Sequence, residues 1–218
     1  MTPYPTTYID NFGKEESSFI SDGMSLKIQL RNHTFIGRNF DSLELKAAEK
    51  DTNLHFSFNE YNSLTDCCFK IKIPIKLKRN SAILDAILNI EIILENSKYP
   101  LTKKFALIID NNIFDLQNGK ESGMEFETQM IQLQRLLPQN MKINSCIFCA
   151  YSNYWVAGSD SFGTLLCFKG IKDKIVAVKN KDEYVDVADN NGVSTQETFW
   201  CSEFTEIAKD QWQYKDPM

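Results

Sequence analysis

Four cysteines lie in the last third of the sequence, and their spacing is the strongest chemical signal in the chain. Cys146 and Cys149 form a C-x2-C pair, and Cys167 and Cys201 follow it. Zinc prefers four thiolate or imidazole ligands in a tetrahedron, and a C-x2-C turn supplies two of them from one short loop. The other two can come from separate strands. The spacing therefore makes Cys146, Cys149, Cys167 and Cys201 candidate ligands of a structural zinc.

Two other interpretations of these cysteines stay open. If residues 143–151 form a regular strand, Cys146 and Cys149 point to opposite faces of the sheet and cannot share a metal ion. Cysteine is also among the most frequently buried residue types, so four core thiols would need no further role. A redox pair is the third interpretation. It is disfavoured because the residues after Cys149 do not have the pattern of a helix whose N-terminus would lower a thiol pKa.

The segment 151–162 is a long polar loop that carries aromatic residues. Tyr and Trp are favoured anchors of protein interfaces, and loops on rigid scaffolds often carry function. We therefore predict Tyr151, Tyr154 and Trp155 as partner-binding residues. The alternative is that these rings close the bottom of the core or cover the zinc.

Other signs of catalysis are sparse. The two histidines, His33 and His55, lie far in the sequence from the four C-terminal cysteines, so a Cys-His pair with one of these would need a contact across the molecule. The G-x-S-x-G, H-E-x-x-H, Walker and G-x-G-x-x-G motifs do not occur. Glu197 and Glu203 flank Cys201 and could do acid-base chemistry, although 29 acidic residues make such a pair expected by chance. No catalytic residue is assigned, and a non-enzymatic role is favoured.

The composition is that of an ordinary globular protein. The 218 residues are 43% hydrophobic and 24% charged, enough for one large domain or two small ones. The net charge of -5 argues against a nucleic-acid binder, which would carry a basic surface. The first residues lack the charged and apolar regions of a signal peptide, and no apolar run is long enough to span a bilayer. We therefore expect a cytoplasmic protein that binds no membrane.

The first half of the chain alternates apolar and polar residues as strands do. In the clearest case, residues 69–78, lysines occupy one face and aliphatic residues the other. We interpret this lysine row as the wet face of an edge strand, with attraction of an acidic partner as the alternative. The predicted strands are residues 24–30, 34–36, 54–58, 69–78, 86–94 and 104–110.

The pattern changes near residue 120. Apolar residues at helical spacing predict an amphipathic helix over 124–137, ended by Pro138. Residues after about 208 lack periodicity and are expected to fray. The remaining predicted elements are strands at 142–151, 163–168, 174–178 and 194–201 and a short helix at 182–189.

These elements predict an α+β fold. We expect a strand-rich, antiparallel, sandwich-like N-terminal part, one amphipathic helix and a smaller C-terminal sheet that carries the four-cysteine cluster. The predicted division is a β-rich part, 1–120, and a cysteine-containing part, 121–218, although the two can equally form one single domain.

The cysteine-rich region also resembles the motif pattern of a protein family. The pattern C-x-F-C-A-Y-S-x-Y begins at Cys146, and FG, CF and QET-x-x-C-x-EF follow it, ending at Phe204. The opening TPYPTTYIDNFG and the stretch FDSLEL are similar to the same family. The chain thus resembles an uncharacterised bacterial family, a domain of unknown function, over nearly its whole length. The resemblance implies that all four cysteine positions recur, but implies no activity, and the C-terminal KDQWQYKDPM departs from it.

These observations predict a non-enzymatic bacterial protein-binding module stabilised by a structural zinc. An acidic protein without catalytic motifs suits an immunity or antitoxin-type neutraliser, which covers a basic partner protein, such as a toxin, through complementary charge. The alternative is a hydrolase or transferase that uses carboxylates or a metal at the cysteine cluster. We expect no nucleic acid among its partners.

Overall fold

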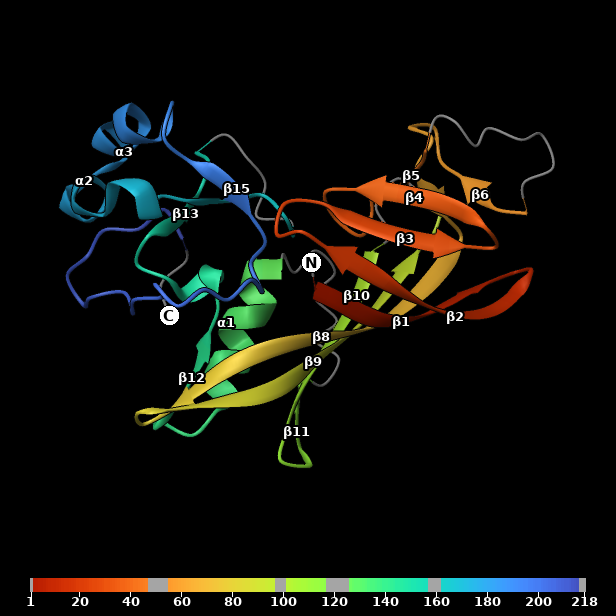
Figure 1. Cartoon of the computed structure of the whole chain (residues 1–218), viewed down its shortest axis with the longest axis horizontal. Helices are drawn as coiled ribbons and strands as arrows, with labels where there is room; N and C mark the ends of the chain where they lie inside the picture. The colour runs from red at the N-terminus through yellow and green to blue at the C-terminus, as the bar shows by residue number, and fades with distance from the viewer. Residues whose placement is uncertain (1, 47–54, 97–100, 117–125, 157–161, 216–218) are drawn as a thin grey trace. The chain divides into compact units, whose positions relative to one another are not determined.

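The computed structural model describes residues 2–46, 55–96, 101–116, 126–156 and 162–215 of the chain (Figure 1). The chain folds as two compact units. The N-terminal unit comprises Met1–Pro74 and Ile87–Met124, and the C-terminal unit comprises Ile75–Ala86 and Glu125–Met218. The predicted strand-rich α+β class with antiparallel sheets and a smaller C-terminal sheet is confirmed. The predicted division at residue 120 stays a prediction.

One large antiparallel sheet contains most of the strands. Its order is β11-β10-β9-β8-β1-β2-β3-β4-β5, and β12 also pairs with β8. A separate two-stranded sheet consists of β6 (Ser57–Phe58) and β7 (Leu64–Thr65). The strands of the main path are β1 (Thr2–Asp10), β2 (Gly13–Ser21), β3 (Leu26–Leu30), β4 (His33–Gly37), β5 (Glu44–Leu45), β8 (Cys67–Arg79), β9 (Ala82–Leu94), β10 (Leu101–Ile109) and β11 (Asn112–Asp115).

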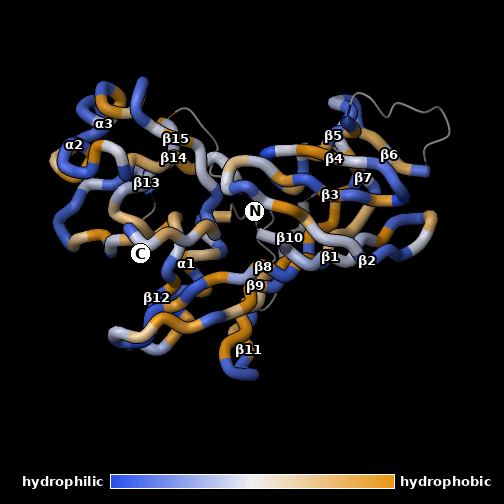
Figure 2. Tube along the Cα trace, in the orientation of Figure 1, coloured by the Kyte–Doolittle hydropathy of each residue, from blue (hydrophilic) through white to orange (hydrophobic). Residues whose placement is uncertain are grey.

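Alternating burial gives the sheet one apolar face. Along β8, Ile71 and Ile73 are buried while Lys70 and Lys72 are exposed, because successive strand residues point to opposite faces. Figure 2 shows apolar and polar stretches alternating along these strands. Aromatic rings fill the core of the N-terminal unit, and Phe69 packs 5.3 Å from the rings of both Tyr8 and Phe19. The predicted strand 69–78 is therefore confirmed.

The edge-strand interpretation of β8 is wrong, because β8 has neighbours on both sides. Strand β9 lies on one side, and on the other β1 pairs with residues 67–71 and β12 with residues 76–79. Pro74, which has no N–H to donate, falls between the two paired stretches. The sequence reading missed β1 and β2, whose prolines and polar residues weaken the alternation, and so left β8 without this neighbour.

A half-buried arginine, Arg31, connects the N-terminal hairpins. Arg31 lies in the β3–β4 turn with a φ of 45°, and its two terminal nitrogens bind the Asp10 carboxylate at 2.6 and 2.8 Å. Its guanidinium also lies 5.0 Å from the Phe56 ring centre and 5.5 Å from that of Tyr8. Burial acts to raise the pKa of Asp10, but hydrogen bonds from Arg31 and Tyr8 hold that pKa below its usual range. The pair is thus matched in charge and geometry.

The C-terminal unit is built from shorter elements. Its three-stranded antiparallel sheet has the order β13-β14-β15. Helix α1 confirms the predicted amphipathic helix and buries Met130 and Leu133. The elements are α1 (Phe126–Leu136), β12 (Met141–Asn144), the 3-10 helix η2 (Cys146–Phe148), β13 (Ser152–Tyr154), β14 (Leu165–Cys167), the 3-10 helix η3 (Lys169–Ile171), α2 (Lys172–Ala177), α3 (Lys181–Ala188) and β15 (Val193–Thr195).

Four sequence expectations for this unit are wrong. Residues 174–177 of the predicted strand 174–178 belong to α2. The predicted strand 142–151 ends at Asn144, shortly before η2, and the predicted strand 194–201 ends at Thr195. Residues 211–215 do not fray. Trp212 and Tyr214 pack against the buried Tyr184 ring, at centroid distances of 5.6 and 6.2 Å. Aromatic rings of the helices and of the last segment bury one another. The sequence of either segment alone therefore does not show that it is buried. None of the described helices has the length and apolarity to cross a membrane.

Candidate functional site

The C-x2-C pair lies on a tight turn. Cys146 begins η2, and the Cys149 N–H closes the turn on the Cys146 carbonyl at 3.1 Å. The Ser152 hydroxyl donates to the carbonyls of both cysteines, at 3.1 Å in the case of Cys149. The chain is therefore not a regular strand here, and the objection that the two thiols must point to opposite faces does not apply.

Hydrogen bonds bring the segments of the other two cysteines to this turn. Cys167 ends β14, where it pairs with Ser152, three residues after Cys149. The segment before Cys201 is held by the Cys146 N–H, which donates to the Phe199 carbonyl at 2.8 Å. The segment after it is held by Ala150, whose N–H donates to the Thr205 carbonyl at 2.8 Å.

The four thiols influence one another electrostatically. Burial raises the pKa of Cys146 to about 12, and the thiols of Cys167, Cys149 and Cys201 raise it further. Burial also raises the pKa of Cys167, while the Lys169 N–H donates to its sulfur and lowers it. All six cysteines are free thiols. Among the described residues, no three Cys, His, Asp or Glu side chains already have the geometry of a metal site. The four-cysteine zinc cluster therefore stays a prediction.

Lys215 inserts its ammonium group beside the C-x2-C turn. The residue is 9% exposed, and its Nζ donates to the carbonyls of Ile147 and Cys149 at 3.0 and 2.9 Å and to the Ser152 hydroxyl at 3.0 Å. Burial lowers the pKa of Lys215 to about 8, while the charges of Cys149, Glu127 and Cys146 act in the opposite direction. The sequence reading missed this residue, because a single lysine in a polar tail gives no burial signal.

Glu197 is another buried ionisable group of this unit. It is fully buried, and its Oε2 accepts the Gly163 N–H at 2.6 Å. Burial raises the pKa of Glu197 to about 7, against several backbone N–H donors that lower it. Its Oε1 has no hydrogen-bond partner among the described residues. A carboxyl in this environment is partly protonated near neutral pH and can donate from Oε1.

Glu203, the other member of the proposed carboxylate pair, lies in a different environment. It is exposed, and Lys172 donates to its Oε2 at 2.7 Å, which holds the pKa of Glu203 below its usual range. The two carboxylates therefore differ in charge near neutral pH, and they are held by different groups. Nothing in these contacts makes them a functional pair.

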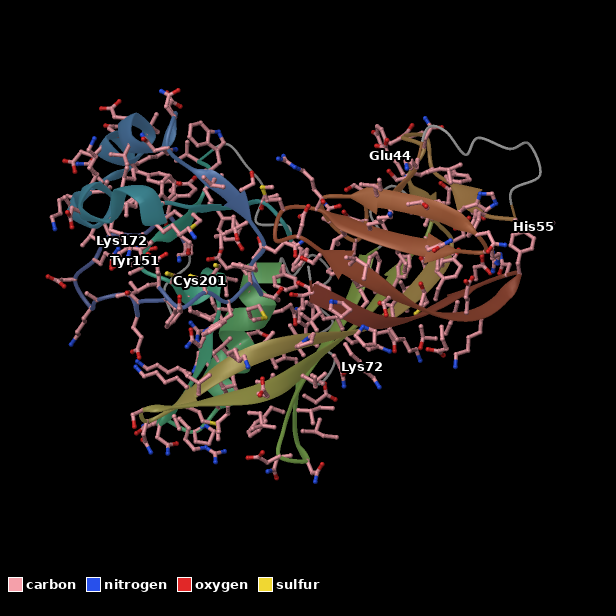
Figure 3. All side chains as sticks on the ribbon, in the orientation of Figure 1. Glu44, His55, Lys72, Tyr151, Lys172 and Cys201 are labelled. Atoms are coloured by element: carbon pink, nitrogen blue, oxygen red, sulfur yellow. The ribbon has the colours of Figure 1, made fainter. Side chains whose placement is uncertain are left out.

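The predicted partner-binding aromatics lie at different depths. Tyr154 is 3% exposed in β13, and Trp155 packs against the cluster around Phe168 and Tyr184. Tyr151 is half-buried, with the Lys172 ammonium 5.2 Å from its ring centre, and Figure 3 shows both residues near Cys201. Tyr154 fits the alternative interpretation, in which the ring belongs to the core. Partner binding by Tyr151, Tyr154 and Trp155 stays a prediction, and residues 157–161 of the loop lie outside the described residues.

A groove of about 430 Å³ crosses the polar side of the large sheet within the N-terminal unit. Lys104 donates to Glu91 at 3.0 Å and holds the pKa of Glu91 below its usual range, and Lys70 lies 3.6 Å from the same carboxylate. Lys72 forms no ion pair with any described residue, and Figure 3 shows its side chain pointing away from β8. The charged residues that line the groove are Glu16, Lys70, Lys72, Glu91, Lys104 and Asp115.

The two histidines lie in the N-terminal unit and serve packing. The His33 ring contacts Phe56 edge to face at 5.9 Å, and the His55 ring lies 5.2 Å from Phe12. Figure 3 shows His55 in the loop beside the N-terminal hairpins. Among the described contacts of either histidine there is no thiol and no carboxylate of a catalytic pair.

Comparison with known proteins gives a single family match. The model of a family of unknown function (DUF6304) matches residues 2–152. The match includes Cys146 and Cys149 and ends before Cys167 and Cys201. No curated protein and no solved structure matches the chain.

Proposed function

This chain belongs to the family of unknown function DUF6304, and we propose from its own residues that it is a non-enzymatic module that binds another protein. The partner we propose is a basic protein, and the role is neutralisation of the immunity or antitoxin type. A structural zinc held by four cysteines stabilises the C-terminal unit. Each part has its own support and its own test.

The observation that carries the binding proposal is the polar groove in the N-terminal unit. It offers three lysines and three carboxylates across the strands β2, β8, β9, β10 and β11. Positively and negatively charged side chains in fixed positions select a partner whose charges match them in place, rather than any partner of opposite net charge. The net charge of -5 adds long-range attraction for a basic protein. Lys72 forms no ion pair with a described residue, although its charge helps to lower the pKa of Glu16, and we propose it as the groove lysine that meets a partner's carboxylate.

The test is capture from cells by the full-length chain. Wild type is compared with Lys72→Glu, which reverses one charge in the groove, and with Lys174→Glu, the same change at an exposed position of α2. A protein captured by wild type and by Lys174→Glu, lost with Lys72→Glu, and binding again after separate purification supports the proposal. Equal capture of every protein by the two variants contradicts it.

The zinc proposal is supported by the convergence of the four cysteine segments and by the effect of the neighbouring thiols on the pKa of Cys146 and of Cys167. Four thiolates would close the tetrahedron, so the metal would have no open position for a substrate. Small units with little buried apolar surface are commonly stabilised by a bound structural metal. The role proposed for the zinc is therefore folding of this unit.

A hydrolase or transferase is the second candidate function, and Glu197 is the observation that favours it. A buried carboxyl with a pKa raised to about 7 and an unpartnered oxygen is the kind of group that general acids use. Replacing the proposed zinc with cobalt distinguishes a closed structural site from an open catalytic site. A four-thiolate cobalt spectrum that is unchanged by added cyanide supports a closed structural site. A spectrum that changes with cyanide shows an open coordination position and favours the enzyme.

A further inference from the structure

Two rows of side chains cross the strands along the groove of the N-terminal unit, and the charged groups of the first row pair with one another. The Thr7 hydroxyl donates to Glu16 at 2.7 Å, and Thr7 is paired with Lys70 on the neighbouring strand. Lys70 and Lys104 both lie against the Glu91 carboxylate, at 3.6 and 3.0 Å. The first row is therefore occupied by its own ion pairs and hydrogen bonds.

The second row lies beside it and crosses the strands from β8 to β11. Asn89 on β9 pairs with Ala106 on β10, and Ala106 pairs with Asp115 on β11. Lys72 belongs to this row on β8, because the lysine–glutamate ion pair of the first row lies two residues from Lys72 on β8 and two residues from Asn89 on β9. The order across the sheet is thus Lys72, Asn89, Ala106 and Asp115, and all four residues line the groove.

The polar groups of the second row are not satisfied by the part of the chain that the structure describes. Neither Lys72 nor Asp115 forms an ion pair with a described residue, although the charge of Lys72 acts on Glu16. Lys72 points away from β8 (Figure 3). Asn89 Oδ1 is buried and accepts no hydrogen bond from a described residue, which is unfavourable, and rotation about the soft χ2 torsion turns this oxygen toward the groove. The row presents a cation, an amide and an anion in sequence.

The separation of the two unpaired charges indicates the length of a ligand that meets both. Strands β8 and β11 are three strand spacings apart, which is about 14 Å. An extended chain rises about 3.3 Å per residue, so about four residues span this distance, and side chains four residues apart point to the same side. An α-helix is about 10 Å wide, whereas neighbouring rows of the sheet are only about 7 Å apart. The second row therefore fits an extended segment better than a helix.

We propose that the groove binds an extended segment of the partner protein that lies across the strands, with an acidic side chain at Lys72 and a basic side chain, four residues away, at Asp115. A backbone N–H of the segment donates to Asn89 between these two contacts. The inference rests on the binding part of the proposed function and adds to it the local sequence that the partner must carry. Opposite charges at the two ends of the row select this segment over one with two like charges.

The first test follows peptide titrations of isotope-labelled, full-length protein by NMR. Three pentapeptides with blocked ends share a central Thr-Ser-Thr and carry one Lys and one Glu, two Lys, or two Glu as their terminal residues. Wild type should bind the Lys/Glu peptide roughly fivefold or more tightly than the other two. Absence of binding, or equal affinity for all three peptides, would overturn the proposal.

Charge-reversal variants test the two ends of the row separately. Lys72→Glu leaves an anion at both ends and should prefer the two-Lys peptide, whereas Asp115→Lys leaves a cation at both ends and should prefer the two-Glu peptide. Lys174→Glu, at an exposed position of α2, is the matched control and should keep the order of wild type. A residue with a purely structural role would weaken all three peptides alike, so an unchanged order of affinity in the two groove variants contradicts the assignment.

A measurement on wild type keeps the proposal testable if a variant does not fold. Carbodiimide coupling joins a carboxylate to an amine in contact with it, and mass spectrometry identifies the joined residues. The Lys/Glu peptide should become linked through its Glu to Lys72 and through its Lys to Asp115. Equal coupling to Lys72 and to the exposed Lys174 would show random contact and overturn the proposal.

The outcomes separate this inference from the proposed function on which it rests. If Lys72→Glu loses a captured protein but no peptide preference is found, the groove binds its partner by other contacts and this inference alone is wrong. If the peptide preferences change as stated but capture does not, the segment site exists and the proposed function alone is wrong. Failure of both experiments overturns both.

Discussion

The two units of the protein differ in the length of their strands and in how their buried charged groups are paired. In the N-terminal unit, long paired strands place one apolar face in the core, and the buried charge of Arg31 meets Asp10 in a two-point contact. In the C-terminal unit, the three strands of the small sheet have three residues each, and the ionisable residues Glu127, Glu197 and Lys215 are buried, with the charge of Glu127 acting on Lys215.

The difference indicates where each unit obtains its stability. A continuous ladder with an aromatic core is complete within its own residues, because burial and backbone hydrogen bonds form together. A unit of short elements has fewer ladder hydrogen bonds and less apolar area to stabilise it, and this unit also buries the ammonium group of Lys215. We propose that the N-terminal unit folds from its own contacts, whereas the C-terminal unit would be stabilised by the proposed zinc.

The largest effect is expected from chelation, which should unfold the C-terminal unit and leave the other intact. Binding of a structural zinc contributes on the order of 10 kcal/mol, more than most small units have in total. All three tryptophans lie in the C-terminal unit, so their fluorescence reports on that unit alone. Tryptophan emission should shift to the red while the β-sheet circular dichroism signal persists. Loss of both signals together would show that the units do not differ in this way.

The next largest effect is expected from Asp10→Asn, which leaves Arg31 partly buried without its counter-charge. Breaking a buried pair from one side costs about 3 kcal/mol or more, here in the free energy of unfolding of the N-terminal unit. Urea denaturation followed by circular dichroism measures it, with Asp115→Asn at an exposed position as the control. A loss no greater than that of the control would mean that the pair is not a significant support of this unit.

Glu197 gives a pH-dependent test within the C-terminal unit. Its folded pKa of about 7 lies above the ordinary value of 4.5, so the folded state holds a proton that the unfolded state releases between these two pH values. Stability is therefore lost as pH rises from about 4.5 to 7, by up to about 3 kcal/mol. Glu197→Gln removes the titration, and its stability relative to wild type should increase over that range. Parallel stability curves for the two proteins, followed by tryptophan fluorescence, would contradict a raised pKa.

The smallest effect on stability is expected from Lys72→Glu. The residue is exposed and forms no ion pair with any described residue, so the free energy of unfolding should change by less than about 0.5 kcal/mol. Partner capture, in contrast, should be lost. A thermal melt of the variant used for capture checks the first point. A large destabilisation would mean that Lys72 stabilises the sheet itself and is not a groove residue that serves only partner binding.

The regular parts of the fold were accessible from the sequence. Residues 69–78 and the helix near 124–137 repeat at periods of two and about 3.6, and both elements form where their patterns indicate. Strands β1 and β2 were missed because prolines and polar residues replace the apolar positions that would have revealed them. Helix α2 was taken for a strand, since six residues are too few to separate the two periods.

The candidate site was accessible only in part. Cysteine spacing identified the segments that converge on η2, because two cysteines on one turn are encoded locally. The burial of Lys215 and Glu197 depends on segments distant in sequence that fold over them, and neither residue type predicts burial. The groove was also invisible, since its lining comes from strands whose order the sequence pattern does not specify.

We propose that the C-terminal unit is stabilised by a zinc ion bound to its four cysteines. Elemental analysis of untagged protein, combined with thiol titration before and after chelation, tests it most directly. We predict one zinc per chain and four thiols that react only after chelation, in addition to any reaction of Cys67 and Cys68. Protein without metal, whose thiols react identically with and without chelator while the tryptophan emission is that of a folded unit, would contradict it.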